Sequence, residues 1–225
     1  MELDLYELEE RINQQRNVYR NLPPARLVEI ALAKGEGILT NNGALRVTTG
    51  KYTGRSPKDR FIVDEEPVTS EIWWGSMNQS FSPEAFDRLC QRVLDYVQDK
   101  TLYVFDGFLG ADPAYRLPVR IINEKASQNL FANQLFLWPT ADELLRHEPE
   151  FTVIAAPGFQ AVPERDGTRS EAFVLISLTR RLVLIGGTHY CGEIKKSMFS
   201  IMNYLLPAQG VLPMHCSANK GRDGD

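Results

Sequence analysis

The chain has 225 residues, of which 43% are hydrophobic and 24% charged, so it can bury a sizeable core as one large or two small domains. Its net charge of −4 argues against a broad nucleic-acid-binding surface and confines any anion site to a focal cluster of cations. No apolar run approaches the roughly 18 residues of a membrane span, and the opening MELDLYELEE is acidic where a signal peptide is basic. We therefore expect a cytoplasmic protein without nucleic-acid or membrane partners.

Hydrophobic patterning and turn residues predict alternating helices and strands. The expected helices cover residues 4–19, 24–34, 83–99, 124–132 and a segment that begins at 192. The expected strands lie in 37–50, 61–64, 102–110, 115–123, 151–157, 171–178, 181–187 and from 211 onward. Because hairpin signals coexist with helical crossovers, the sequence predicts an α/β (α+β-like) fold with a mixed sheet and flanking helices.

Several boundaries have specific chemical signals. Pro23-Pro24 opens the second helix and Gly35 ends it. Asn42-Gly43 supplies the two turn residues of a hairpin, and Ser82 is the expected N-cap of the third helix. Arg180-Arg181 marks a turn between strands. The third helix should bury Phe86, Leu89, Val93 and Val97.

The three cysteines are too few and too scattered for a disulfide framework, because their number is odd and none forms a C-x-x-C pair. Cys90 falls in a helical pattern and is expected in the core. Cys191 and Cys216 lie beside polar site candidates, where a packing role is favoured over ligand contact.

The segment KYTGRSPKDRFIV concentrates four cations, Lys51, Arg55, Lys58 and Arg60, around Gly54 and Pro57. An arginine on a stiff turn presents a planar guanidinium that binds carboxylate or phosphate with two hydrogen bonds. Arg55 is therefore the residue expected to bind such an anion. The alternative is an exposed basic loop whose charges are balanced by Asp59 and Asp64.

The last helix carries two adjacent lysines, Lys195 and Lys196, in its first turn. The partial positive charge of a helix N-terminus disfavours cations there. Three interpretations stay open. The pair binds an anionic ligand, or one lysine is neutral and acts as a metal ligand or base, or both lysines are simply solvated. The strand–turn–helix junction GGTHYCGE should project Tyr190 into the same corner, although Tyr190 and His189 could also just cap the sheet edge.

His215, in VLPMHC, could offer a neutral imidazole to a divalent metal. A histidine with a lysine is no standard zinc set, so Mn²⁺ completed by phosphate oxygens, water and a carboxylate is the better match. A lysine binds metal only when deprotonated, and the helix N-terminus, a cationic neighbour and the ion all favour that form of Lys196.

Three segments in this order, TGRSPKDRFIV, GGTHYCGEIKKSMFSIMNYLLP and LPMHCSANKGRDGD, resemble the ATP-dependent phosphoenolpyruvate carboxykinase family. The resemblance runs from about Ala25 to the end of the sequence and implies the N-terminal fold of that family. Within these segments it departs from the family at Cys191 and in the basic run Lys220-Gly221-Arg222.

The resemblance implies conversion of oxaloacetate and ATP to phosphoenolpyruvate, CO₂ and ADP with Mn²⁺ and Mg²⁺, at the start of gluconeogenesis. It assigns the substrate carboxylate to Arg55 and a place beside substrate and CO₂ to Tyr190. It assigns Mn²⁺ coordination to Lys196 and His215, both of which also approach the γ-phosphate.

The sequence contains no G-x-x-x-x-G-K-[ST] loop and no downstream acidic ligand, which the family uses to hold ATP phosphates and metal. We therefore expect residues 1–210 to form an N-terminal substrate-binding domain and residues 211–225 to begin a C-terminal nucleotide-binding domain, so that this fragment alone is inactive. A stand-alone, non-catalytic carboxylate-binding domain is the alternative. A GTP-dependent carboxykinase is weaker, because the T-G-R-S-P-K-D loop resembles the ATP class.

Overall fold

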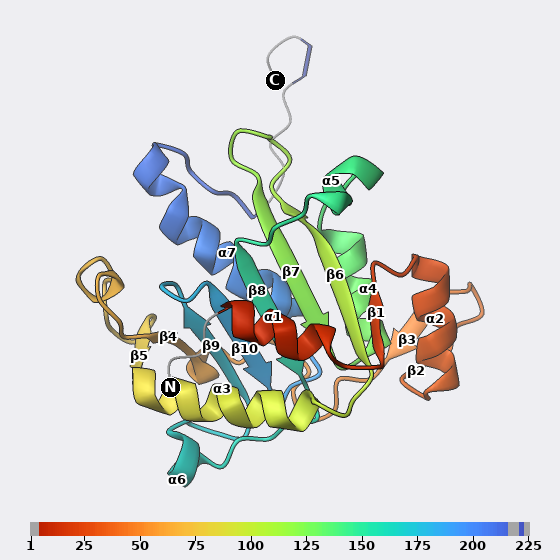
Figure 1. Cartoon of the computed structure of the whole chain (residues 1–225), viewed down its shortest axis with the longest axis horizontal. Coiled ribbons are helices and arrows are strands. Elements are labelled where there is room, and N and C mark those ends of the chain that lie inside the picture. The colour runs from red at the N-terminus through yellow and green to blue at the C-terminus, as the bar shows by residue number, and fades with distance from the viewer. Residues whose placement is uncertain (1–4, 216–220, 223–225) are drawn as a thin grey trace.

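The computed structural model describes residues 5–215 and 221–222, which form a mixed α/β structure around one large sheet (Figure 1). The strands of this sheet are β1 (Val18–Arg20), β4 (Arg60–Val63), β5 (Gln79–Phe81), β6 (Leu102–Leu109), β7 (Leu117–Asn123), β8 (Phe151–Ala156), β9 (Phe173–Ser177) and β10 (Leu182–Gly186). A separate hairpin consists of β2 (Gly37–Leu39) and β3 (Leu45–Val47). The helices are α1 (Leu5–Asn13), α2 (Pro24–Ala33), α3 (Pro83–Val97), α4 (Ala126–Leu135), α5 (Ala141–Leu145), α6 (Pro163–Asp166) and α7 (Gly192–Leu205).

The large sheet has the strand order β1-β6-β7-β8-β10-β9-β4-β5. Two pairs, β6 with β7 and β9 with β10, are antiparallel, and the other neighbours are parallel. This arrangement confirms the mixed sheet that the sequence predicts. The carboxyl ends of the central parallel strands β7, β8 and β10 lie at one edge of the sheet. In the sequence, α4 follows β7 and α7 follows β10.

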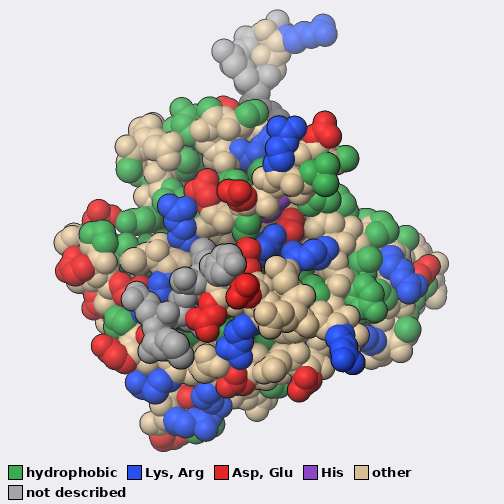
Figure 2. All heavy atoms as spheres, in the orientation of Figure 1, with side chains coloured by type: hydrophobic (Ala, Val, Ile, Leu, Met, Phe, Trp, Pro, Cys, Tyr) green, Lys and Arg blue, Asp and Glu red, His purple; other side chains and the backbone are tan. Residues whose placement is uncertain are grey.

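Side chains that alternate along the central strands build two cores, one on each face of the sheet. One core packs against α1 and α3 and contains Leu8, Ile12 and the predicted helical face of α3. The other packs against α7 and the end of α4. Figure 1 shows α1 and α3 crossing in front of the sheet and α7 behind it. Acidic and basic side chains are interspersed on the front face (Figure 2).

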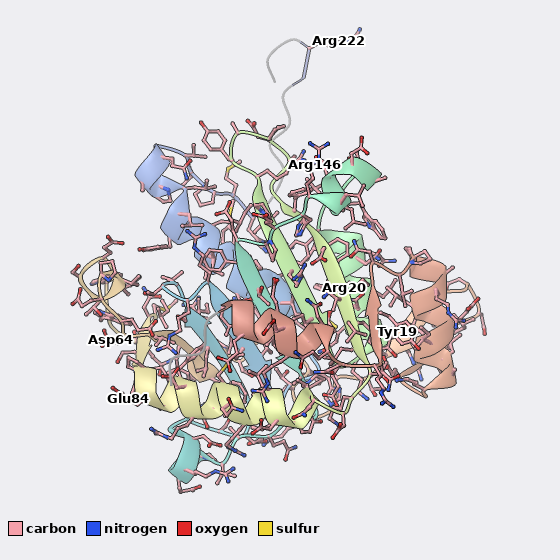
Figure 3. The ribbon with its side chains drawn as sticks, in the orientation of Figure 1. Tyr19, Arg20, Asp64, Glu84, Arg146 and Arg222 are labelled. Carbon is pink, nitrogen blue, oxygen red and sulfur yellow. The ribbon has the colours of Figure 1, made fainter. Side chains whose placement is uncertain are left out.

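The third helix follows its sequence signals closely. Ser82 Oγ accepts the Ala85 N–H at 3.3 Å as N-cap, and Glu84 lies in the first turn (Figure 3). All four predicted core positions of α3 are buried, and Cys90 is 1% exposed. Burial raises the pKa of the Cys90 thiol to about 12.

The first helix ends earlier than its pattern predicts. It stops at Asn13, and Val18–Arg20 forms the edge strand β1 beside β6. The prediction for residues 14–19 is wrong because the β6 backbone offers hydrogen bonds that the helix would forfeit, including Leu102 N–H to the Asn17 carbonyl at 2.9 Å. Val18 and Tyr19 also favour extended backbone.

Three other boundaries differ from expectation. The helix predicted from Glu124 begins at Ala126, because Glu124 N–H extends the ladder to the Ala155 carbonyl at 3.0 Å. The hairpin has a five-residue loop at 40–44 instead of a two-residue turn, although Gly43 does adopt the left-handed φ of +81° that Asn-Gly favours. The strands β1 and β5 and the short helices α5 and α6 have no counterpart in the sequence prediction.

The strand predicted from Val211 does not form over residues 211–215, which have no strand or helix. Gly210, with φ of +74°, ends the turn Pro207–Gln209, and Pro213 lacks the N–H that a ladder needs. Residues 216–220 and 223–225, including Cys216, lie outside the described residues. Among the described residues, no helix combines the length and the apolar character needed to cross a bilayer.

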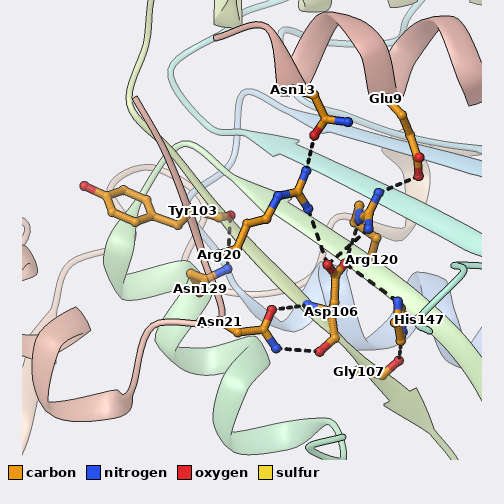
Figure 4. A network of polar contacts seen from close by, with 10 residues as sticks. All are labelled: Glu9, Asn13, Arg20, Asn21, Tyr103, Asp106, Gly107, Arg120, Asn129 and His147. Atoms are coloured by element: carbon orange, nitrogen blue, oxygen red, sulfur yellow. Dashed lines mark hydrogen bonds and ion pairs between the residues drawn. The ribbon is translucent and has the colours of Figure 1, made fainter. Parts of the chain in front are cut away.

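A buried polar network holds the N-terminal strand to the sheet (Figure 4). Arg120 on β7 donates from Nε and Nη2 to the two Asp106 carboxylate oxygens at 2.6 and 3.1 Å. Arg20 on β1 reaches the same carboxylate at 3.3 Å, and Glu9 on α1 accepts from Arg120 Nη1. Carboxylates and guanidinium groups on four elements, α1, β1, β6 and β7, therefore satisfy one another away from the candidate site.

Candidate functional site

A buried carboxylate, that of Asp59, anchors the loop that carries Arg55. Asp59 is 4% exposed, accepts the Ser170 hydroxyl at 2.9 Å and pairs with Arg169 at 3.5 Å. Asp64 accepts the Thr69 hydroxyl at 2.7 Å. Among the described contacts, neither aspartate therefore neutralises Arg55, which speaks against a loop balanced by its own aspartates.

Two hydrogen bonds join this loop and β4 to α7. Glu193, in the first turn of α7, accepts the Ser56 N–H at 2.7 Å. Arg60 donates to the Ser200 hydroxyl at 2.6 Å and to the Met77 carbonyl at 2.9 Å. Burial and the charge of Arg55 lower the pKa of Arg60. The two cationic motifs of the sequence thus meet in space.

A pocket of about 600 Å³ lies where these elements meet, and both Arg55 and Lys196 line it. Arg60 and Ser200 form part of the same wall, and Trp73, which is 85% exposed, lies on the opposite loop. A volume of this size accommodates a small metabolite, and convergent cations select an anionic one. The pocket therefore supports the prediction that Arg55 and Lys196 act on one ligand.

A second pocket, of about 680 Å³, adjoins the first across Phe199 and is lined by Lys195 and His215. The Lys196 ammonium lies 5.3 Å from the centroid of the Phe199 ring, and the His215 ring packs edge-on at 4.9 Å from the same ring. Phe199, a residue that sequence reasoning missed, thus contacts both of the expected nitrogen ligands.

Desolvation, followed by the charges of Lys195 and Lys196, lowers the pKa of His215. The neutral imidazole is the form that binds a metal ion, so the environment of His215 fits the predicted role. No group of three or more histidine, cysteine or acidic side chains suited to a metal occurs within residues 5–215 and 221–222. The described residues would supply only part of a coordination shell.

Tyr190 lies in the turn between β10 and α7, where its N–H donates to the Thr188 hydroxyl at 3.2 Å. Its ring covers Gly192 so closely that a Cβ there would overlap it. Tyr190 lines neither of the two pockets, so the structure brings together Arg55, Lys196 and the neighbourhood of His215 but does not place Tyr190 with them. Burial and the charge of Lys125 lower the pKa of the adjacent His189.

Cys191 immediately precedes α7 and is partly buried. Burial raises the pKa of its thiol to about 11, which keeps it protonated near neutral pH. This environment agrees with the packing role expected for Cys191. The sequence pattern places Glu193 only at the start of the predicted helix, and its buried position cannot be read from that pattern.

Comparison with known proteins gives these motifs a family context. The family model described as phosphoenolpyruvate carboxykinase matches residues 16–225. The chain belongs to the phosphoenolpyruvate carboxykinase family. The carboxykinase match covers all three motifs that carry the resemblance, and it includes every candidate site residue.

Three curated relatives carry the name phosphoenolpyruvate carboxykinase (ATP). The chain is 66% identical over 208 residues to form 1 from Moorella thermoacetica, with 92% of this chain and 40% of the relative covered. It is 61% identical over 213 residues to the Geobacillus kaustophilus protein, with 94% and 40% covered. It is 52% identical over 224 residues to the Bacillus pumilus protein, with 99% and 42% covered. The chain spans about 40% of the length of these relatives.

Proposed function

We propose that this chain is part of an ATP-dependent phosphoenolpyruvate carboxykinase, which converts oxaloacetate and ATP to phosphoenolpyruvate, CO₂ and ADP in gluconeogenesis. The shared pocket of Arg55 and Lys196 is the observation that carries the proposal, because it puts a planar guanidinium and a lysine side chain on one small-molecule site. The printed names of the relatives support ATP as the phosphoryl donor. A cytoplasmic location is proposed with it, as for a soluble metabolic enzyme.

The proposed roles follow from charge and position. Decarboxylation breaks the carbon–carbon bond to the departing CO₂ and leaves an enolate, whose oxygen then accepts the γ-phosphoryl group as ADP leaves. Arg55 holds the substrate carboxylate, and Lys195 and Lys196 stabilise the negative charge that develops on the enolate and phosphate. Tyr190 lies beside the substrate and CO₂.

Lys196 and His215 are the residues proposed to hold Mn²⁺, and Mg²⁺ would accompany ATP. When bound, the metal supplies further stabilisation of negative charge on oxygen. The lowered pKa of His215 supports this assignment, because it favours the unprotonated ring nitrogen. We assign Lys195 charge without coordination.

Substitution of Arg55 in the full-length enzyme tests the substrate role. Arg55→Ala should raise the KM for oxaloacetate by roughly tenfold or more, since hydrogen bonds to charged groups contribute about 1.5–3 kcal/mol. Arg55→Lys should not restore the KM, because an ammonium cannot replace the planar fork. Lys58→Ala, which removes an exposed cation from the same loop, is the control. A wild-type KM for both Arg55 variants would refute the substrate role.

Metal binding is tested separately by electron spin resonance titration with Mn²⁺. Lys196→Ala and His215→Ala should each weaken Mn²⁺ binding and lower turnover. Lys195→Ala should affect chiefly anion binding and leave the Mn²⁺ affinity near that of the parent. Parent-like affinity in both ligand variants would rule out the proposed coordination.

We further propose that residues 1–210 form the substrate-binding domain and residues 211–225 lead into a nucleotide-binding domain. About 60% of the relatives' length lies outside the match, which in those proteins leaves room for a further domain. The purified 225-residue chain should then bind ATP negligibly and show no carboxykinase activity. ATP-dependent decarboxylation by this chain would overturn the division.

A further inference from the structure

Glu193 is a buried carboxylate with an unusual task for its position. It is the second residue of α7 and is 2% exposed, whereas a glutamate in a first turn commonly faces solvent or its own helix. Its Oε1 instead accepts the main-chain N–H of Ser56 at 2.7 Å, across 137 residues of sequence. The side chain therefore points away from its own helix and binds the loop that contains Ser56.

This hydrogen bond joins the Arg55 loop to α7, the two elements that contribute Arg55 and Lys196 to the cationic pocket. Ser56 directly follows Arg55, and Lys196 lies one helical turn after Glu193. Arg55 and Lys196 both line the 600 Å³ pocket. The spacing between the Arg55 and Lys196 side chains thus depends on the contact that holds the Arg55 loop to the first turn of α7.

A second contact holds β4 to α7 farther along the helix. Arg60 donates to the Ser200 hydroxyl at 2.6 Å, and that hydroxyl lies 3.0 Å from the Lys196 carbonyl. This contact holds β4 to the middle of α7 but does not reach the residue next to Arg55. Among the described contacts, the hydrogen bond from Ser56 to Glu193 is the one that ties the residue next to Arg55 to α7.

Charge gives the same residue a reason to be an acid. Arg55, Arg60, Lys195 and Lys196 lie on these elements, and the negative charge of Glu193 raises the pKa of Arg60 against the effect of burial and Arg55. Of the other acidic side chains nearby, Asp59 pairs with Arg169, and Glu71 accepts the Tyr204 hydroxyl. Both are therefore engaged elsewhere.

We propose that Glu193 is a positioning residue that holds Arg55 at the correct distance from Lys196 to bind the substrate carboxylate. The proposal rests on the function proposed above. Glu193 touches neither substrate nor metal in this account; it acts through the Ser56 N–H and thus through Arg55.

Reach and charge can be separated in the full-length enzyme. Glu193→Gln retains an oxygen acceptor at the same distance and should keep the KM for oxaloacetate within about threefold of the parent. Glu193→Asp keeps the charge but is one methylene shorter, and Glu193→Ala loses both. These two variants should raise the KM about tenfold, with kcat and Mn²⁺ affinity changed less than about twofold. The reverse order, with Asp normal and Gln impaired, would overturn a positional role.

A double-mutant cycle shows whether Glu193 acts through Arg55. In an Arg55→Ala background, Glu193→Ala should raise the KM by no more than about twofold further. Independent, multiplicative effects would overturn the proposal. If Arg55→Ala raises the KM but the Glu193 variants do not, only the positioning role fails. If Arg55→Ala itself leaves the KM unchanged, the proposed function fails first.

Asp166 provides a matched control. It is also a buried carboxylate, 4% exposed, that accepts a main-chain N–H, from Val162 at 2.7 Å. It belongs to α6, which contacts α3 on the other face of the sheet. Asp166→Ala should lower thermal stability without changing the KM. A KM change as large as that of Glu193→Ala would attribute both effects to general loosening and overturn the proposal.

Discussion

Loss of one partner from the buried pair of Asp106 and Arg120 should lower the free energy of unfolding by a large and measurable amount. Asp106 is 5% exposed and Arg120 is 8% exposed, and two hydrogen bonds join them. Although burial opposes its charge, hydrogen bonds and attraction to Asp106 and Glu9 raise the pKa of Arg120. Asp106→Ala leaves a buried guanidinium with Glu9 as its remaining described carboxylate partner.

Breaking a buried ion pair costs about 3–5 kcal/mol. Because Glu9 still accepts from Arg120 Nη1, the lower end, about 3 kcal/mol, is expected for Asp106→Ala. For a chain of this size, each kcal/mol lowers the Tm by about 2–4 °C, so the Tm should fall by roughly 6–12 °C. Urea and thermal unfolding of the 225-residue chain, followed by circular dichroism, measure both quantities.

The double variant makes the reasoning falsifiable. Arg120→Met should cost a similar amount, but Asp106→Ala with Arg120→Met should cost less than the sum by about 1.5–3 kcal/mol, since no unpaired charge then remains between them. Arg26→Ala, which breaks an ion pair to Glu29 that is more than half exposed on both sides, should cost at most about 0.5 kcal/mol. Additive effects, or a cost below about 1 kcal/mol for Asp106→Ala, would refute the account.

Three further predictions concern local structure. Ser82→Ala should destabilise the chain by about 1 kcal/mol in urea unfolding, because α3 loses its N-cap. Gly187→Ala should cost clearly more than Gly35→Ala: both have φ of +67°, but a Cβ at Gly187 would collide with main-chain atoms, whereas at Gly35 it meets open space. In a Cys216→Ser background, a thiol reagent at pH 8 should modify Cys191 about a hundredfold more slowly than an ordinary cysteine, with a rate that rises about tenfold per pH unit. A fast reaction at pH 8 would contradict the raised pKa of about 11.

Sequence patterns were most informative where local chemistry decides the structure. The Ser82 cap and the apolar face of α3 depend on neighbours within a few residues, and both predictions are confirmed. Patterns failed where distant segments decide. Residues 17–20 join β6, more than 80 positions away, and the extended preference of Val18 and Tyr19 alone was too weak to mark a strand there over a continued helix.

The same distinction applies to the candidate site. Arg55 and Lys196 could be singled out because a cationic loop and a lysine pair are visible in the sequence, and the pocket brings them together. Glu193 and Phe199 could not be assigned a role, since one looks like a common first-turn acid and the other like a core aromatic. Their importance comes from contacts with Ser56 and His215, which only the fold supplies. The roles assigned to Arg55, Tyr190, Lys196 and His215 all stay predictions.

The strand order of the large sheet also constrains how the chain can assemble during synthesis. Its middle, β7-β8-β10-β9, comes from residues 117–186, whereas the edges β1, β4 and β5 come from the first 81 residues. Arg60 on β4 pairs with Val174 on β9, so the Arg55 loop cannot dock until more than a hundred later residues have left the ribosome. Such non-local pairing slows folding and leaves early strands unpaired meanwhile. The basic Arg55 loop therefore spends much of the synthesis of this chain without its β-sheet partner, within reach of chaperones and of the polyanionic ribosome surface.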